Sequence, residues 1–130
     1  VGAWGKTLRL KSPRTRFTLR APRQPSAFTL TARVYVDRPG TILQRGSALT
    51  LTTRQARVGK RGARVSLPRK RWTRVAVTFD GTTIRTYRDG RLVQARRGGP
   101  LPRTSARIRV GGLVGAVKDI RLYEGVSARP

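Results

Sequence analysis

The feature that most constrains the fold is the segment from Trp72 to Val93, WTRVAVTFDGTTIRTYRDGRLV, which contains two Asp-Gly pairs. Asp-Gly is a strong signal for a two-residue hairpin turn, because a type I′ turn needs positive φ at both central residues. The pairs are Asp80-Gly81 and Asp89-Gly90, and β-branched and aromatic residues lie around them. The segment therefore predicts three short antiparallel strands joined by two tight turns.

Alternation of apolar and polar residues predicts further strands with one buried face. In residues 28–36 the apolar positions are predicted to face a core: Phe28, Leu30, Ala32, Val34 and Val36. The intervening residues are predicted to face outward: Thr29, Thr31, Arg33 and Tyr35. Shorter versions of the pattern are the pairs Leu8 and Leu10, Phe17 and Leu19, and Ile108 and Val110. Because the other face of these strands carries Arg, Lys or Thr, many basic residues are expected on regular sheet surfaces.

Pro and Gly clusters interrupt the chain about every 8 to 12 residues, which is the rhythm of an all-β sandwich. No sustained helical period, internal repeat or domain boundary is present. Residues 1–130 are therefore predicted to form one antiparallel β-sandwich domain, large enough to fold without a metal or a disulfide. The chain begins at Val1 rather than Met, which indicates a processed start, a removed signal or a cut from a longer protein.

The same segments resemble the laminin G-like modules of the concanavalin A-like jelly-roll superfamily. In these modules a Trp-x-x-Val-Ala strand leads through an Asp-Gly turn into a Tyr-x-Asp-Gly hairpin, and the matching residues are Trp72, Val75, Ala76, Asp80, Gly81, Tyr87, Asp89, Gly90 and Val93. Residues 115–123 are similar to the closing strand of the modules, and residues 7–10, 16–20, 28–36 and 40–43 to their first strands. The resemblance implies a jelly-roll fold and favours an extracellular, cell-surface or virion location.

The charge balance is extreme, with 30 basic residues, 5 acidic residues and a net charge of +25. Most of the basic residues are Arg, whose planar fork binds carboxylate, sulfate and phosphate. Genome bias can replace Lys by Arg, but it does not explain the scarcity of acids, so we expect an anionic partner. The candidate polyanion-binding residues are the members of basic clusters: Lys60, Arg61, Arg64, Arg69, Lys70, Arg71, Arg74, Arg96 and Arg97.

Catalytic and metal-binding side chains are scarce. The chain has no Cys and no His, which removes thiolate nucleophiles, the commonest metal ligand and the usual general base. Glycan hydrolysis needs two positioned carboxylates. Asp80, Asp89 and Asp37 are assigned to turns, and Asp119 and Glu124 are expected to pair with nearby Arg. The resemblance implies calcium or glucanase variants, but no two acids cluster and the Glu-x-Asp-x-x-Glu pattern is missing. We therefore predict no catalytic residue, no metal and no cofactor.

The two tryptophans are predicted to differ. Trp72 matches a family position that packs at the start of its strand, so it is expected in the core. Trp4 has no such assignment and is the candidate for stacking on a ligand.

Two functions fit these features. The first is a non-catalytic binding module that recognises an anionic polymer, most plausibly an acidic glycan, through an Arg-rich surface. The alternative is a structural component of a large assembly, such as a phage capsid decoration or tail protein, that docks on acidic protein subunits or nucleic acid. Nucleic acid is expected to bind only non-specifically, because the sequence has no recognition motif and few free aromatics. Membrane insertion is not expected, since no apolar run approaches the length of a span.

Overall fold

The computed structural model describes residues 2–99 and 101–127, which form thirteen β-strands and no helix. In chain order the strands are β1 (Gly2–Trp4), β2 (Leu8–Leu10), β3 (Phe17–Leu19), β4 (Phe28–Arg38), β5 (Thr41–Arg45), β6 (Leu49–Thr52), β7 (Gln55–Val58), β8 (Arg61–Arg64), β9 (Trp72–Phe79), β10 (Thr83–Arg88), β11 (Arg91–Arg97), β12 (Ile108–Val110) and β13 (Val114–Glu124). No described segment is a helix that could cross a membrane.

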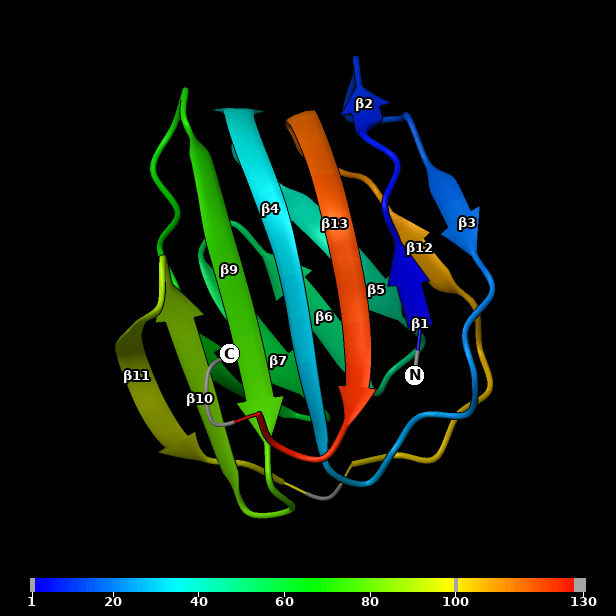
Figure 1. Ribbon diagram of the computed structural model, residues 1–130, viewed down its shortest axis with the longest axis vertical. Helices are drawn as coiled ribbons and strands as arrows, with labels where there is room; N and C mark the ends of the chain where they lie inside the picture. Colours follow the sequence, from blue (N-terminus) through cyan, green and yellow to red (C-terminus); the bar gives the residue numbers. More distant parts are fainter. Residues whose placement is uncertain (1, 100, 128–130) are drawn as a thin grey trace.

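The strands form two antiparallel sheets packed face to face, as Figure 1 shows. The seven-stranded sheet has the order β1-β13-β4-β9-β10-β11, with β2 also pairing with β13. The six-stranded sheet has the order β3-β12-β5-β6-β7-β8. The predicted fold, an antiparallel jelly-roll sandwich, is confirmed. Its long strands β4, β9 and β13 come from distant parts of the chain and lie side by side.

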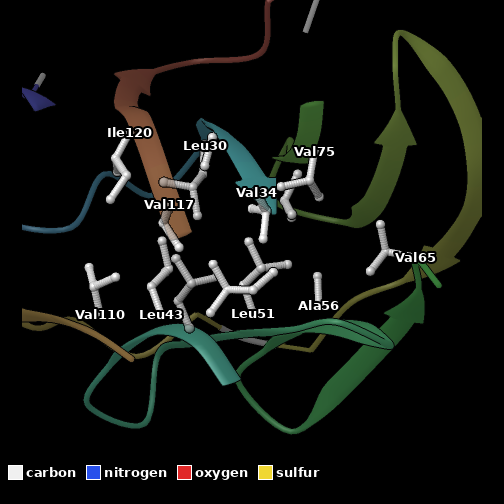
Figure 2. Close-up of a cluster of buried hydrophobic side chains, with 14 of the residues drawn as sticks. Leu30, Val34, Leu43, Leu51, Ala56, Val65, Val75, Val110, Val117 and Ile120 are labelled. Atoms are coloured by element: carbon white, nitrogen blue, oxygen red, sulfur yellow. The ribbon is translucent and has the colours of Figure 1, made fainter. Parts of the chain in front are cut away.

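The core lies between the two sheets (Figure 2). Leu30, Val34 and Val117 point down from the seven-stranded sheet toward Leu43 and Leu51 of the six-stranded sheet. The predicted core positions of the strand over residues 28–36 are all buried: Phe28, Leu30, Ala32, Val34 and Val36. Burial of each large apolar side chain stabilises the sandwich by about 1.5–3 kcal/mol.

The predicted meander from Trp72 to Val93 is present, but only one of its turns is the expected type. Asp89 and Gly90 have φ of 50° and 81°, as a type I′ turn requires. At the other turn Gly81 has positive φ and Asp80 does not. There the Asp80 N–H donates to the Thr83 carbonyl, so Gly81 and Thr82 are the central residues. The prediction of a turn centred on Asp80-Gly81 was wrong by one residue, because the Asp80 carboxylate instead accepts hydrogen bonds from Thr82 and Thr83.

The outward face of β4 is also less open than the alternation predicts. Thr29 and Thr31 are 0% and 5% exposed. After β13 the chain turns back across this face (Figure 1), and the Thr29 hydroxyl donates to the Gly125 carbonyl and accepts from the Ser127 N–H. The segment Gly125–Ser127 therefore covers one end of the sheet and leaves the region around Arg33 exposed.

Candidate functional site

The outer face of the seven-stranded sheet gathers basic side chains from three strands. Arg33 on β4 pairs with Arg74 on β9 and with Lys118 on β13. Directly paired residues project to the same side of a sheet. The register therefore aligns three cations in one row across strands that are distant in sequence.

A bulge in β13 adds a fourth cation to this face. The register between β13 and β4 shifts between Lys118 and Arg121, and Asp119 has a φ of 51° within the bulge. The extra residue lets Val117 and Ile120 both reach the core, while Lys118 and Arg121 both lie on the outer side. Arg121 is exposed and pairs with Thr31.

Exposed aromatic rings lie beside these cations. Trp72 is 42% exposed, its ring centroid is 5.8 Å from that of Tyr35, and the Lys118 ammonium lies 4.2 Å from its ring centroid. Such an ammonium is attracted to the face of an indole ring. The expectation that Trp72 belongs to the core is therefore wrong, because its position on β9 alternates with the inward-facing Thr73 and Val75. Tyr123 on β13 is 37% exposed on the same face.

Trp4 lies elsewhere. It pairs with Ile120 at the β1 edge of the sheet, is half-buried and packs against the core. Its role as a ligand-stacking residue remains a prediction, and Trp72 and Tyr123 offer more exposed rings.

Three hollows on this face share Arg74. One of about 500 Å³ lies between Arg74, Arg121, Tyr123 and the segment Gly125–Ser127. Another of about 430 Å³ adjoins Arg74, Arg33 and Trp72. The smallest, of about 110 Å³, is lined by Arg33, Arg74 and Arg121, among others. We refer to the following residues together as the basic–aromatic face: Arg33, Trp72, Arg74, Lys118, Arg121 and Tyr123.

Acidic residues orient the face and only partly neutralise it. Arg33 lies 3.7 Å from Asp119, which confirms the expected ion pair of Asp119. The Arg74 N–H donates to the Asp89 carboxylate at 2.9 Å, and the Asp89 N–H donates to the Arg74 carbonyl at 2.8 Å. The Asp89-Gly90 turn therefore fixes the backbone of Arg74. An exposed ion pair such as that of Arg33 with Asp119 contributes at most about 1 kcal/mol to the stability of the fold.

Glu124 was also expected to pair with Arg, but no ion pair of Glu124 is present within the described residues. Glu124 instead lines the 500 Å³ hollow. Across residues 2–99 and 101–127, no group of three or more His, Cys, Asp or Glu side chains is positioned to hold a metal.

The predicted polyanion-binding residues separate into two groups. Arg69, Lys70, Arg71 and Arg74 lie at or just before the start of β9. Lys60, Arg61 and Arg64 belong to the β7–β8 hairpin and Arg96 and Arg97 belong to β11, and of these five residues Arg64 and Arg96 line a common groove. Of these nine residues only Arg74 belongs to the basic–aromatic face.

Sequence reasoning did not single out Arg33 and Arg121 as binding residues, although it placed Arg33 on an outward face. Arg33 stands between Ala32 and Val34, and Arg121 stands between Ile120 and Leu122, so neither belongs to a run of basic residues. Only the β13-β4-β9 order brings them beside Arg74, and the sequence carries no local signal of that order.

Comparison with known proteins identifies a family that the sequence matches. The sequence matches the concanavalin A-like lectin/glucanases superfamily over residues 11–127. No curated protein matches the sequence.

Three solved structures illustrate what this chain is similar to. The binding domain of botulinum neurotoxin DC in complex with SialylT is 8% identical, with 97% of this chain and 43% of that chain covered and a TM-score of 0.59. Domain 4 of a GH43 extracellular arabinanase from Geobacillus stearothermophilus, in complex with arabinotriose, is 13% identical. The match covers 94% of this chain and 84% of that chain, with a TM-score of 0.58. The heptameric SAP-like pentraxin from Limulus polyphemus is 11% identical, with 93% of this chain and 76% of that chain covered and a TM-score of 0.64. This chain spans about two fifths of the botulinum binding domains, and at these identities the likeness shows the fold alone.

Proposed function

Because this chain belongs to the concanavalin A-like lectin/glucanase superfamily, we propose that it is a non-catalytic module that binds an anionic glycan through the basic–aromatic face. We further propose that residues 1–130 act as one such module. The observation that carries the proposal is the set of hollows around Arg74, in which guanidinium groups adjoin exposed aromatic rings.

Each part of the face suits one part of an acidic sugar. A pyranose ring can lie on the apolar face of Trp72 or Tyr123, since aromatic rings provide rigid contact area with a polar edge. A carboxylate or sulfate group can accept paired hydrogen bonds from Arg74 or Arg121. The complexes with SialylT and arabinotriose among similar structures support a glycan as the class of partner.

The proposal is tested by calorimetric titration with an oligogalacturonate, using a neutral oligosaccharide of equal length as the reference ligand. The variant R74Q/R121Q should bind the acidic oligomer at least about tenfold more weakly, which corresponds to about 1.4 kcal/mol. The control R57Q/R109Q removes the same charge from the outer face of the six-stranded sheet and should change affinity by less than about twofold. Equal losses in the two variants would show that bulk charge alone binds the ligand.

Trp72→Ala tests the aromatic half of the site. It leaves the net charge unchanged, so the proposal predicts weaker oligogalacturonate binding with an unchanged dependence on salt. If Trp72→Ala bound the oligogalacturonate with wild-type affinity, Trp72 would have no stacking role.

The distribution of charge supports a second candidate, a structural component of a large assembly. Arg57, Arg107 and Arg109 are exposed on the six-stranded side, opposite the basic–aromatic face. Basic residues on several faces suit docking between acidic subunits. In that case R57Q/R109Q should weaken binding to an acidic protein surface as much as R74Q/R121Q does, and the neutral and acidic oligosaccharides should both fail to bind.

A further inference from the structure

A second basic site lies where the edge strands of the two sheets meet. The Arg64 N–H on β8 donates to the Gln94 side-chain oxygen on β11 at 2.7 Å. The Thr86 hydroxyl on β10 donates to the Arg64 carbonyl at 2.5 Å, and the Arg88 guanidinium donates to the Ser66 carbonyl at 2.6 Å. These bonds join the sheets and fix the backbone that carries Arg64. β11 is the outermost strand of the front sheet in Figure 1.

A groove of about 460 Å³ runs along this junction, which we call the edge groove. Three arginines line it, Arg54, Arg64 and Arg96, together with Gln55 and Gln94. Its described lining contains no acidic and no aromatic residue. None of these arginines takes part in an ion pair among the described residues.

The turn that carries Arg54 is held by a local hydrogen-bond network. The Thr52 hydroxyl oxygen accepts from the N–H groups of Arg54 and Gln55, at 3.2 and 3.1 Å. The Arg54 carbonyl accepts from Val65 N–H at 2.8 Å, which links the turn to the end of β8. The three arginines thus extend from the hydrogen-bonded backbone of three elements, the β6–β7 turn, β8 and β11, so little backbone ordering is needed when a ligand binds.

We propose that the edge groove is a second anion-binding site, separate from the basic–aromatic face, that takes the phosphate groups of a polyphosphorylated chain. A tetrahedral phosphate presents oxygens to donors from several directions, whereas one Arg fork satisfies a planar carboxylate. Phosphate also carries up to two negative charges, which suits three guanidiniums without an acidic partner. The lack of an aromatic ring leaves no platform for a sugar or a base. Arg61 and Arg97 are exposed on β8 and β11, the strands that carry Arg64 and Arg96, and Lys60 is exposed just before β8.

Titration calorimetry with inorganic tripolyphosphate at constant ionic strength tests this site. The variant R54Q/R64Q/R96Q should bind at least about tenfold more weakly than the wild type. The control R57Q/R107Q/R109Q removes the same charge from exposed positions on the six-stranded sheet and should lose less than about twofold. Thermal melts of the two variants at the same salt verify that both are folded.

Similar losses in the two triple variants would overturn the proposal, because bulk charge would then explain binding. Inorganic sulfate that displaces tripolyphosphate as efficiently as inorganic phosphate does would overturn the choice of phosphate. R74Q/R121Q should retain tripolyphosphate binding while losing oligogalacturonate binding. The two titrations therefore distinguish a wrong assignment of the edge groove from a wrong assignment of the glycan site.

Discussion

Arg45 is the largest completely buried side chain among residues 2–99 and 101–127. Its guanidinium donates to the Ala106 carbonyl at 2.9 Å, to the Gln24 side-chain oxygen at 3.1 Å and to the Pro22 carbonyl. Burial lowers the pKa of Arg45, but an Arg side chain remains charged in proteins. Arg45 joins the loop before β4 to the loop before β12, and the expectation that strand arginines face outward fails at this position.

Replacing Arg45 with Met should destabilise the fold by about 3 kcal/mol. The Ala106 and Pro22 carbonyls and the side-chain oxygen of the buried Gln24 would lose their hydrogen-bond donor. Arg45→Lys should also destabilise, because an ammonium cannot reproduce the planar fork. Denaturant unfolding at fixed salt measures both changes, and a loss below about 1 kcal/mol in Arg45→Met would contradict this role.

Asp80 gives the protein an acid-sensitive contact. The backbone N–H of Thr83 and then that of Thr82 hydrogen-bond to its carboxylate and hold its pKa well below the ordinary value of 3.8. The Arg85 guanidinium lies 3.1 Å from the other oxygen. A carboxylate whose pKa is lower in the folded state stabilises the fold above its unfolded pKa, and this stabilisation is lost as the pH falls.

The prediction from this shift concerns the variant Asp80→Asn. Its loss of stability relative to the wild type should be greatest above pH 3.8 and should shrink at lower pH, where the carboxyl group of the unfolded wild-type chain binds a proton and that of the folded chain does not. Free energies of unfolding between about pH 6 and pH 2 measure the difference. A difference that is constant with pH would exclude a charge effect at Asp80.

At the scale of elements, hairpins and single strands could be predicted from the sequence, whereas three neighbouring strands of the six-stranded sheet, β6, β7 and β8, could not. Turn residues and apolar alternation act locally, so the meander and the strand over residues 28–36 were confirmed. No specific strand is predicted for residues 49–64, where β6, β7 and β8 form. These strands have only four residues each, and small residues such as Ala56, Gly62 and Ala63 weaken the apolar signal.

The candidate site is less predictable than the strands because it depends on contacts between distant segments. Arg33, Arg74 and Lys118 become neighbours only through the pairing of β4 with β9 and β13. The bulge at Asp119 also reverses the simple alternation, so counting residues along β13 gives the wrong side for Arg121. Trp72 is misassigned for a related reason, since its exposure follows from the face of β9 that it occupies.

The turn that supports Arg74 makes Gly90 an informative position. A side chain at Gly90 would meet nothing within 4 Å, so its effect would come only from the φ of 81°. Gly90→Ala should therefore destabilise the protein by about 1–2 kcal/mol. Gly5→Ala is the matched control, because that position is also open and is not among those with positive φ. Equal denaturation midpoints for the two variants would contradict the assignment of strain to the turn.

At the scale of the whole molecule, the net charge of +25 opposes the compact state through self-repulsion. Three described ion pairs, all exposed, offset little of it. The melting temperature should rise by several degrees from low to physiological ionic strength, since about 1 kcal/mol of screened repulsion corresponds to roughly 4 °C at this chain length. Calorimetric melts without polyanions test this, and a flat or falling trend would show that repulsion is unimportant.

The central claim is that a defined face, rather than total charge, selects an anionic glycan. Elution from immobilised heparin and from a sulfonate resin under the same salt gradient tests it most directly, because both matrices sense bulk charge and only heparin offers sugar rings. We expect the wild type and R57Q/R109Q to leave heparin at higher salt than the sulfonate resin, and we expect R74Q/R121Q to lose this difference. Elution of the wild type from both matrices at the same salt would contradict it.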